Sequence, residues 1–116
     1  MSLLVMKFGG TSLASTDLIK EAAERVKAQV LLGYEVVVIV SAMSGKTNEL
    51  VGWVNDTSSM YDAREYDAVV SSGEQVTAGL MALVLQELDV PARSWLGWQV
   101  PLRTKGSHGA ARIKDI

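Results

Sequence analysis

The sequence predicts an α/β protein organised around a parallel sheet. Two short apolar runs, at residues 3–8 and 34–40, flank a stretch of helical periodicity at residues 16–32. The second run is a continuous series rich in β-branched side chains, which is typical of a strand buried on both faces beneath helices. Strand, helix and strand in this order form a βαβ unit, whose crossover we expect to be right-handed.

The first predicted strand, which we expect to be buried, ends at a lysine and two glycines: Lys7, Gly9 and Gly10, followed by the hydroxyl pair Thr11 and Ser12. Paired glycines let the main chain approach a ligand closely and direct N–H groups at an anion. Lys7 adds a positive charge beside them. We interpret the stretch as a phosphate-binding loop, although a tight turn alone can also require glycines.

The helix at residues 16–32 has clear start and stop signals. Ser15 or Thr16 can cap its first turn, Gly33 suits its end, and Glu21 and Arg25 have the spacing of an ion pair. One face repeats apolar side chains at helical intervals: Ile19, Ala22, Ala23, Val26 and Val30.

A second loop follows the second strand. Its Gly-Lys-Thr triplet at residues 45–47 matches the end of a P-loop motif. That motif also requires a glycine five residues before Gly45, but this position is Val40, so the P-loop interpretation fails. Ligands of open α/β sheets lie at the carboxyl ends of the strands. Ser41 and Thr47 are therefore expected on the same rim as Lys7. Ser44 or Thr47 can equally cap the following helix, and both roles remain open.

Farther along, Ser71 and Glu74 have the spacing of a capping box, which competes with any binding role for Glu74. The following helix is expected to end before Pro91, and Gly79 within it suggests close packing against another backbone. Residues 92–96 read as a third strand, and residues 102–116 show no defined element. The apolar positions expected on the helix are Val76, Leu80, Leu83, Val84 and Leu88.

Composition narrows the function classes. The chain has 116 residues, no cysteine and one histidine, which rules out disulfides and thiolate sites and makes a histidine metal site improbable. No metal ligands are assigned. No apolar run is long enough for a membrane span and no signal peptide is recognised, so a cytoplasmic protein is expected. The basic residues near the C-terminus are spaced apart and have no interleaved aromatic residues beyond Trp95 and Trp98, which argues against nucleic-acid binding.

Five segments together resemble the N-terminal part of aspartokinases, within the amino-acid-kinase superfamily. They cover nearly the whole chain in order: residues 5–12 (Val-Met-Lys-Phe-Gly-Gly-Thr-Ser), 41–43 (Ser-Ala-Met), 47–50 (Thr-Asn-Glu-Leu), 72–74 (Ser-Gly-Glu) and 97–99 (Gly-Trp-Gln). The chain departs from the family at Lys105-Gly106, where an acidic residue tends to follow Thr104, and this puts local pairing there in doubt.

The resemblance implies an incomplete three-layer α/β/α sandwich with a mainly parallel sheet, formed by residues 1–116 as the N-terminal portion of a kinase domain. It implies transfer of a phosphoryl group from ATP, with Mg²⁺, to L-aspartate, giving 4-phospho-L-aspartate at the start of lysine, threonine and methionine biosynthesis. Carried over by position, Lys7 is catalytic and binds ATP phosphates with Gly9, Gly10, Thr11 and Ser12. Ser41, Thr47 and Glu74 bind aspartate.

The same resemblance implies that the nucleotide-base site, a second-half catalytic aspartate and the regulatory ACT domains lie outside these 116 residues. We therefore expect a truncated chain that is inactive alone and belongs to a homo-oligomer. Two alternatives remain. The chain can be a non-catalytic association module that pairs through its unfinished sheet and basic tail, or part of a glutamate or acetylglutamate kinase.

Overall fold

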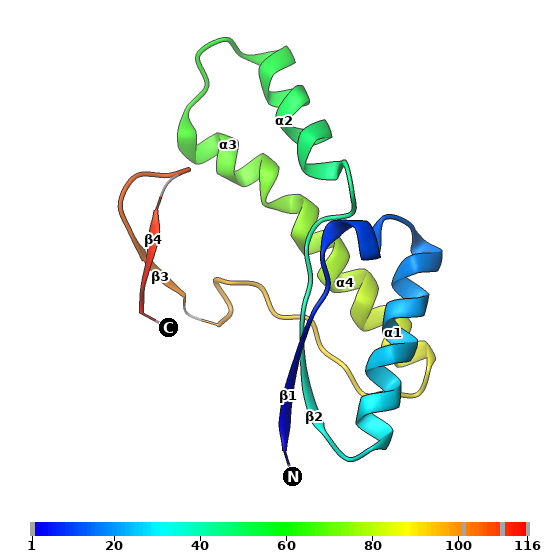
Figure 1. The fold of residues 1–116 in the computed structure, drawn as a ribbon. Coiled ribbons are helices and arrows are strands. Elements are labelled where there is room, and N and C mark those ends of the chain that lie inside the picture. Colours follow the sequence, from blue (N-terminus) through cyan, green and yellow to red (C-terminus); the bar gives the residue numbers. More distant parts are fainter. Residues whose placement is uncertain (1, 101, 110, 116) are drawn as a thin grey trace.

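The computed structural model describes residues 2–100, 102–109 and 111–115. A βαβ unit opens the chain: β1 (Leu3–Lys7), α1 (Thr16–Leu31) and β2 (Glu35–Ile39), with the short 3₁₀ helix η1 (Gly10–Leu13) between β1 and α1. β1 and β2 pair in parallel, with Leu3 opposite Glu35 and Lys7 opposite Ile39 (Figure 1). The predicted α/β class and its parallel strand pair are confirmed.

The predicted boundaries of α1 are also confirmed. The Ser15 hydroxyl accepts a hydrogen bond from the Leu18 N–H at 3.2 Å, which caps the first turn. At the other end Gly33 has φ of +98°, and the Tyr34 N–H donates to the Gln29 carbonyl at 3.3 Å. This is a Schellman arrangement, in which a glycine takes the left-handed conformation and the last carbonyls of the helix are satisfied.

Helices α2 (Lys46–Thr57), α3 (Ala63–Val70) and α4 (Ser72–Glu87) follow β2. A Schellman motif also ends α4, here with Asp89 in the left-handed conformation at φ +61° and the Val90 N–H bonded to the Leu85 carbonyl at 2.9 Å. The helical stretch Ala63–Glu87 is long and apolar enough to cross a membrane by length and composition alone, a test that core helices of soluble proteins also pass.

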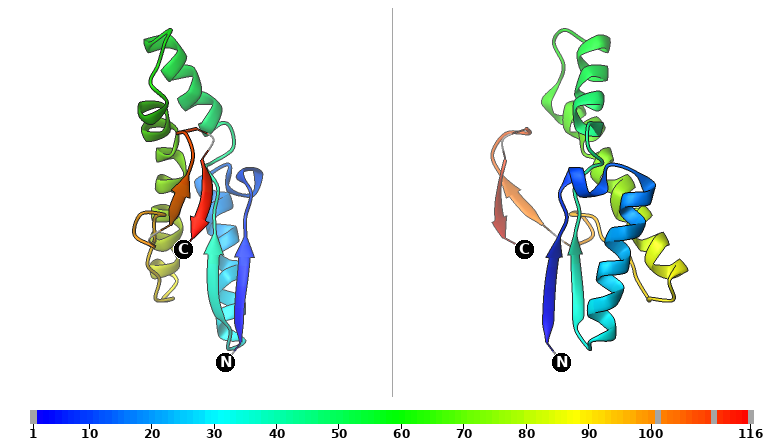
Figure 2. Two further views of the ribbon diagram at one scale, coloured as in Figure 1. Left: turned by 90° about the vertical axis from the view of Figure 1, so that its left-hand side faces the viewer. Right: turned by 45° about the vertical axis from the view of Figure 1, so that its right-hand side comes forward.

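The sheet is covered on one face only (Figure 2). Alternate strand residues, including Met6, Val36 and Val38, pack toward the core between the sheet, α1 and α4. Their neighbours Val5 and Ile39 are 59% and 44% exposed. We expected both strands to be buried, and β2 to be buried on both faces. This was wrong, because no element in the described part of the chain covers the second face of the sheet.

The core lies between α1, α4 and the covered face of the sheet. The face predicted for α1 is confirmed by the burial of Ile19, Ala22, Ala23 and Val26. The face predicted for α4 was right only in part. Leu80, Val84 and Leu88 are partly buried against the core, as expected, but Val76 and Leu83 are exposed. The fully buried residues of this helix are Gly73, Thr77, Met81 and Leu85. Because α4 is apolar around most of its circumference, periodicity could not select the face that packs on α1.

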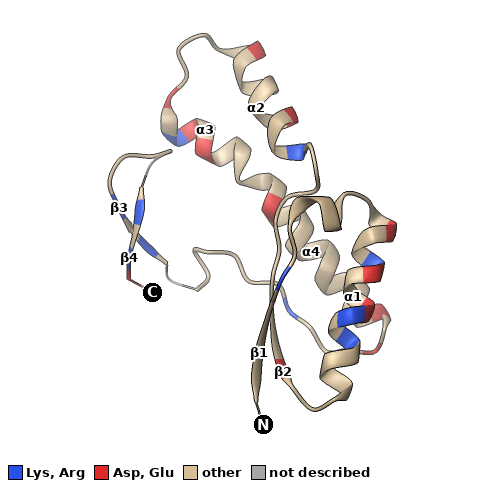
Figure 3. Cartoon of the chain, viewed as in Figure 1, with Lys and Arg blue, Asp and Glu red and all other residues tan. Residues whose placement is uncertain are grey.

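The C-terminal region differs from the sequence expectation in two ways. Residues 91–96 form no strand, since their backbone has no strand partner among the described residues. Residues 102–116, expected to be irregular, contain the antiparallel strands β3 (Arg103–Lys105) and β4 (Arg112–Asp115); positions 110 and 116 lie outside the described residues. β1 and β2 carry one charged residue each, whereas this hairpin is mainly basic (Figure 3).

Candidate functional site

The end of β1 is anchored through Phe8. Its N–H donates to the Ile39 carbonyl at 2.9 Å, which extends the strand ladder by one residue, and its ring is buried. The Arg25 guanidinium lies over this ring at 5.9 Å from the centroid. Arg25 therefore contacts Phe8, and the expected ion pair with Glu21 is not formed. The anchored ring fixes the positions of Lys7 and Gly9 on either side of it.

Gly10 joins the loop after β1 to the loop after β2. The Ser44 N–H donates to the Gly10 carbonyl at 3.1 Å. A Cβ at position 10 would lie 3.0 Å from the Ala42 carbonyl oxygen and 3.6 Å from the Ser44 Cα. The two strand-end loops therefore approach as closely as they do because residue 10 has no side chain.

Gly73 brings the start of α4 to the same place. Its Cβ, if present, would lie 3.0 Å from the Ala42 Cβ and 3.4 Å from the Leu50 Cδ1. Thr77, which is fully buried, donates its hydroxyl to the Gly73 carbonyl at 3.1 Å. Ala42 thus lies between Gly10 and Gly73, and three segments far apart in sequence meet around this one small residue.

The residues proposed from the sequence are distributed around this junction. Lys7 is the last residue of β1, and Gly9, Gly10, Thr11 and Ser12 form the turn into and through η1. Ser41 is half-buried in the loop after β2. Thr47 and Glu74 are exposed in the first turns of α2 and α4. The expectation that Lys7, Ser41 and Thr47 follow the carboxyl ends of neighbouring parallel strands agrees with this placement.

Both capping alternatives were wrong. Gly45 is the N-cap of α2 and offers no side-chain bond, so neither Ser44 nor Thr47 caps that helix. Ser71 has helical backbone angles between α3 and α4 and makes no capping bond, so no capping box forms with Glu74. The near-continuous path from α3 into α4 leaves no non-helical residue to act as a cap. The Thr47 and Glu74 side chains are therefore not committed to capping.

An apolar cleft of about 230 Å³ lies beside the junction, between α2 and α4. Its only charged lining residue in the described part of the chain is Lys46, whose ammonium pairs with Glu49 at 3.2 Å. Sequence reasoning missed Lys46, because the triplet around it was tested only as a P-loop. The cleft is lined by Met43, Lys46, Leu50, Trp53, Ser72, Gly73 and Val76.

Across the described ranges, no three His, Asp or Glu side chains are grouped so as to hold a metal ion. Three charged residues, Lys7, Lys46 and Glu74, lie within four positions in sequence of Gly10, Ala42 or Gly73. The junction thus carries both cationic and anionic side chains around backbone that is held in place by glycine contacts. Such a rim suits a small zwitterionic or anionic ligand bound through hydroxyl, amide and ammonium groups.

Comparison with known proteins agrees with this geometry. The amino acid kinase family matches residues 2–115. Over the whole chain, the sequence is 47% identical to an aspartokinase from Rickettsia felis and 47% identical to aspartokinase 2 from Bacillus subtilis. The chain spans 30% and 28% of the length of these two relatives.

The structure is also similar to a crystal structure of aspartate kinase from Synechocystis, with a TM-score of 0.73 and 42% sequence identity. This match covers 77% of the chain and 15% of the Synechocystis protein. The likeness confirms the expected fold class, with an incomplete parallel sheet, and the expected resemblance to aspartokinases. The chain belongs to the amino acid kinase family.

Proposed function

We propose that this chain forms the aspartate-binding part of an aspartate kinase. In the reaction, a side-chain carboxylate oxygen of L-aspartate attacks the γ-phosphorus of ATP. The bond from that phosphorus to the bridging β–γ oxygen breaks, and ADP leaves with 4-phospho-L-aspartate as the other product. In the proteins that use it, this product supplies lysine, threonine and methionine synthesis.

The observation that carries the proposal is the meeting of Gly10, Ala42 and Gly73. It gathers the segments that hold Lys7, Ser41, Thr47 and Glu74, which are among the side chains that the resemblance assigns to phosphate and aspartate. The identity of 47% to aspartokinases extends over all of these segments. Phosphoryl transfer depends mainly on positioning and charge neutralisation, so a rigid junction with flanking charges suits it.

The residues present fit ATP phosphates. The Gly9 N–H has no hydrogen-bond partner among the described residues, and nothing lies within 4 Å of the position a Cβ would take there. Phosphate oxygens can therefore approach this backbone, with Gly10, Thr11 and Ser12 alongside. The Lys7 ammonium contributes about 4 kcal/mol at ~4 Å from a phosphate oxygen at an effective dielectric near 20. Mg²⁺, when bound with the nucleotide, neutralises phosphate charge.

For aspartate, we assign Glu74 to the ammonium group and the hydroxyls of Ser41 and Thr47 to the carboxylates. These roles suit their charges and their places beside the junction. We further propose that the 116 residues alone do not turn over ATP, and that the protein acts in the cytoplasm as a homo-oligomer without nucleic acid or membrane.

One observation favours an association module as a second candidate. The open face of the sheet exposes the apolar side chains Leu3, Val5, Val37 and Ile39. Contiguous apolar surface of this kind commonly marks an interface. A chain that only associates would bind another subunit through this face without binding aspartate.

A chimaera tests the proposal. The matching 116 residues of Bacillus subtilis aspartokinase 2 are replaced by this chain, and acyl phosphate formation is measured with L-aspartate, L-glutamate or N-acetylglutamate. We expect activity with aspartate above the other two. A folded chimaera that prefers glutamate or acetylglutamate would identify a related kinase, and one that is inactive with all three would favour the association module. The 116-residue chain alone should release no aspartate-dependent ADP.

A further inference from the structure

The β3–β4 hairpin makes little contact with the rest of the molecule. Every described residue of both strands is exposed. Among the described residues, two polar contacts join this hairpin and its turn to the helices. Both end at one carboxylate, that of Asp67 in α3. A two-stranded hairpin is marginally stable in water unless it packs against something else. The Asp67 contact is therefore the feature that holds the hairpin in place.

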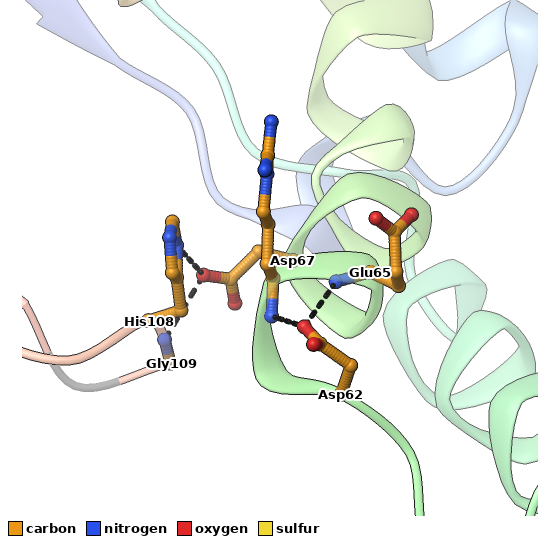
Figure 4. Close-up of polar contacts among 6 residues, drawn as sticks. Asp62, Glu65, Asp67, His108 and Gly109 are labelled. Atoms are coloured by element: carbon orange, nitrogen blue, oxygen red, sulfur yellow. Dashed lines mark hydrogen bonds and ion pairs between the residues drawn. The ribbon is translucent and has the colours of Figure 1, made fainter.

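The contact consists of two interactions at one oxygen (Figure 4). The Gly109 N–H donates to Asp67 Oδ2 at 2.9 Å, and His108 Nδ1 lies 3.3 Å from the same atom. Hydrogen bonds to an ionised carboxylate are stronger than those between neutral groups. Gly109 has φ of +83°, which presents its amide in a backbone conformation that other residues rarely adopt.

A second carboxylate, that of Asp62 at the start of the same helix, has a different role. Asp62 Oδ1 accepts from the backbone N–H groups of Arg64 and Glu65, at 2.7 and 3.3 Å, and so caps α3 (Figure 4). Asp67 lies beyond the first turn of α3 and has no such helical partner. Its side chain, 38% exposed, lies at an open cleft of about 470 Å³ whose lining residues also include Arg64, Ser71 and His108.

We propose that Asp67 is a latch that docks the tip of the β3–β4 hairpin on α3, and that the hairpin moves as an arm when the latch opens. The docked tip lies over the cleft at the α3–α4 junction. The strands bury little apolar surface in the docked state, since their one apolar side chain, Ile113, is 63% exposed. Removing one carboxylate therefore shifts the arm toward its free position while the α1–α4 core stays folded.

Amide hydrogen exchange of the 116-residue chain, followed residue by residue by NMR, tests the latch. In Asp67→Ala, the Gly109 amide should exchange about tenfold faster, as expected for loss of a charge-assisted hydrogen bond. Glu65→Ala is the matched control, because it removes an exposed carboxylate from the same helix without touching the hairpin. His108→Ala should give a smaller increase, since the Gly109 bond remains. Equal Gly109 exchange in wild type and Asp67→Ala would overturn the proposal.

A spin label gives a second measurement, which tests the docked arrangement in the wild type before any Asp67 variant is introduced. The chain has no cysteine, so Ser107→Cys accepts a single label near the hairpin tip. On the wild-type background, the label should broaden the Ala68 amide signal of α3 and leave α1 amides such as that of Lys27 sharp. No broadening at Ala68 would overturn the docked arrangement. Broadening that persists in the Asp67→Ala background would reject the carboxylate as the latch.

Discussion

The backbone N–H of Ser44 donates to the carbonyl oxygen of Gly10 at 3.1 Å, and this bond joins the loops that follow two parallel strands. It requires the two backbones to lie closer than a side chain at position 10 would permit. The geometry of the whole rim depends on this approach, because Ala42, which lies next to it, also contacts the start of α4.

Gly10→Ala should lower the free energy of unfolding by about 1–3 kcal/mol, the usual effect of overpacking. The new methyl group would lie 3.0 Å from the Ala42 carbonyl oxygen, and Ala42 is itself packed against Gly73 on its other side. Urea unfolding followed by tryptophan fluorescence measures the change. Gly9→Ala is the control, since its position is open and its φ of −82° suits any residue. Equal stabilities for the two variants would contradict the close approach.

Gly79→Ala should raise the free energy of unfolding by about 0.5–1 kcal/mol, because alanine loses less backbone entropy in a helix. The sequence suggested close packing at this glycine, which was wrong here: nothing lies within 4 Å of its Cβ position. Gly73→Ala, in the same helix, should instead destabilise through its 3.0 Å approach to Ala42. A destabilising Gly79→Ala would show that another surface packs on this side of α4.

Lys7→Ala in the active chimaera should lower kcat by about 10²–10³-fold, as loss of a group that stabilises developing charge typically does. Steady-state kinetics with saturating ATP and aspartate measures the effect. Lys20→Ala removes an exposed lysine from α1 and should leave kcat unchanged. An unaltered kcat in Lys7→Ala would reject the phosphate role of this side chain.

Glu74→Gln in the chimaera should mainly raise KM for aspartate, because it removes the proposed partner of the substrate ammonium. The free energy of unfolding should change little, since no capping box depends on this carboxylate. Glu87→Gln, at the far end of α4, is the control. Loss of stability with an unchanged KM would make Glu74 a structural residue.

Lys105→Glu should strengthen the hairpin by about 0.2–1 kcal/mol. Lys105 lies opposite Arg112 across the two strands, and facing like charges destabilise a pair. The family's preference for an acidic residue after Thr104 put pairing here in doubt; the strands do pair, with two basic residues facing each other. Slower amide exchange in β4 would register the gain. Lys114→Glu changes the net charge equally without reversing this pair and should not reproduce the effect.

The sequence by itself determined the βαβ unit, because its signals are local. The 3.6-residue period of α1, the Ser15 cap and the Gly33 stop each act over a few residues, and all three recur in the structure. The motif around Lys7 and Gly10 also consists of adjacent residues, and its phosphate-binding role stays a prediction. These local features were sufficient for the fold class and for the resemblance to aspartokinases.

Tertiary structure alone decided what depends on distant partners. The buried face of α4 was set by α1, since α4 is apolar nearly all round, and the open face of β2 was set by the lack of a covering layer among the described residues. The contacts of Ala42 with Gly10 and Gly73, and of Asp67 with Gly109, join segments whose sequences carry no sign of one another. Proximity of this kind arises from chain packing, which periodicity and spacing do not encode.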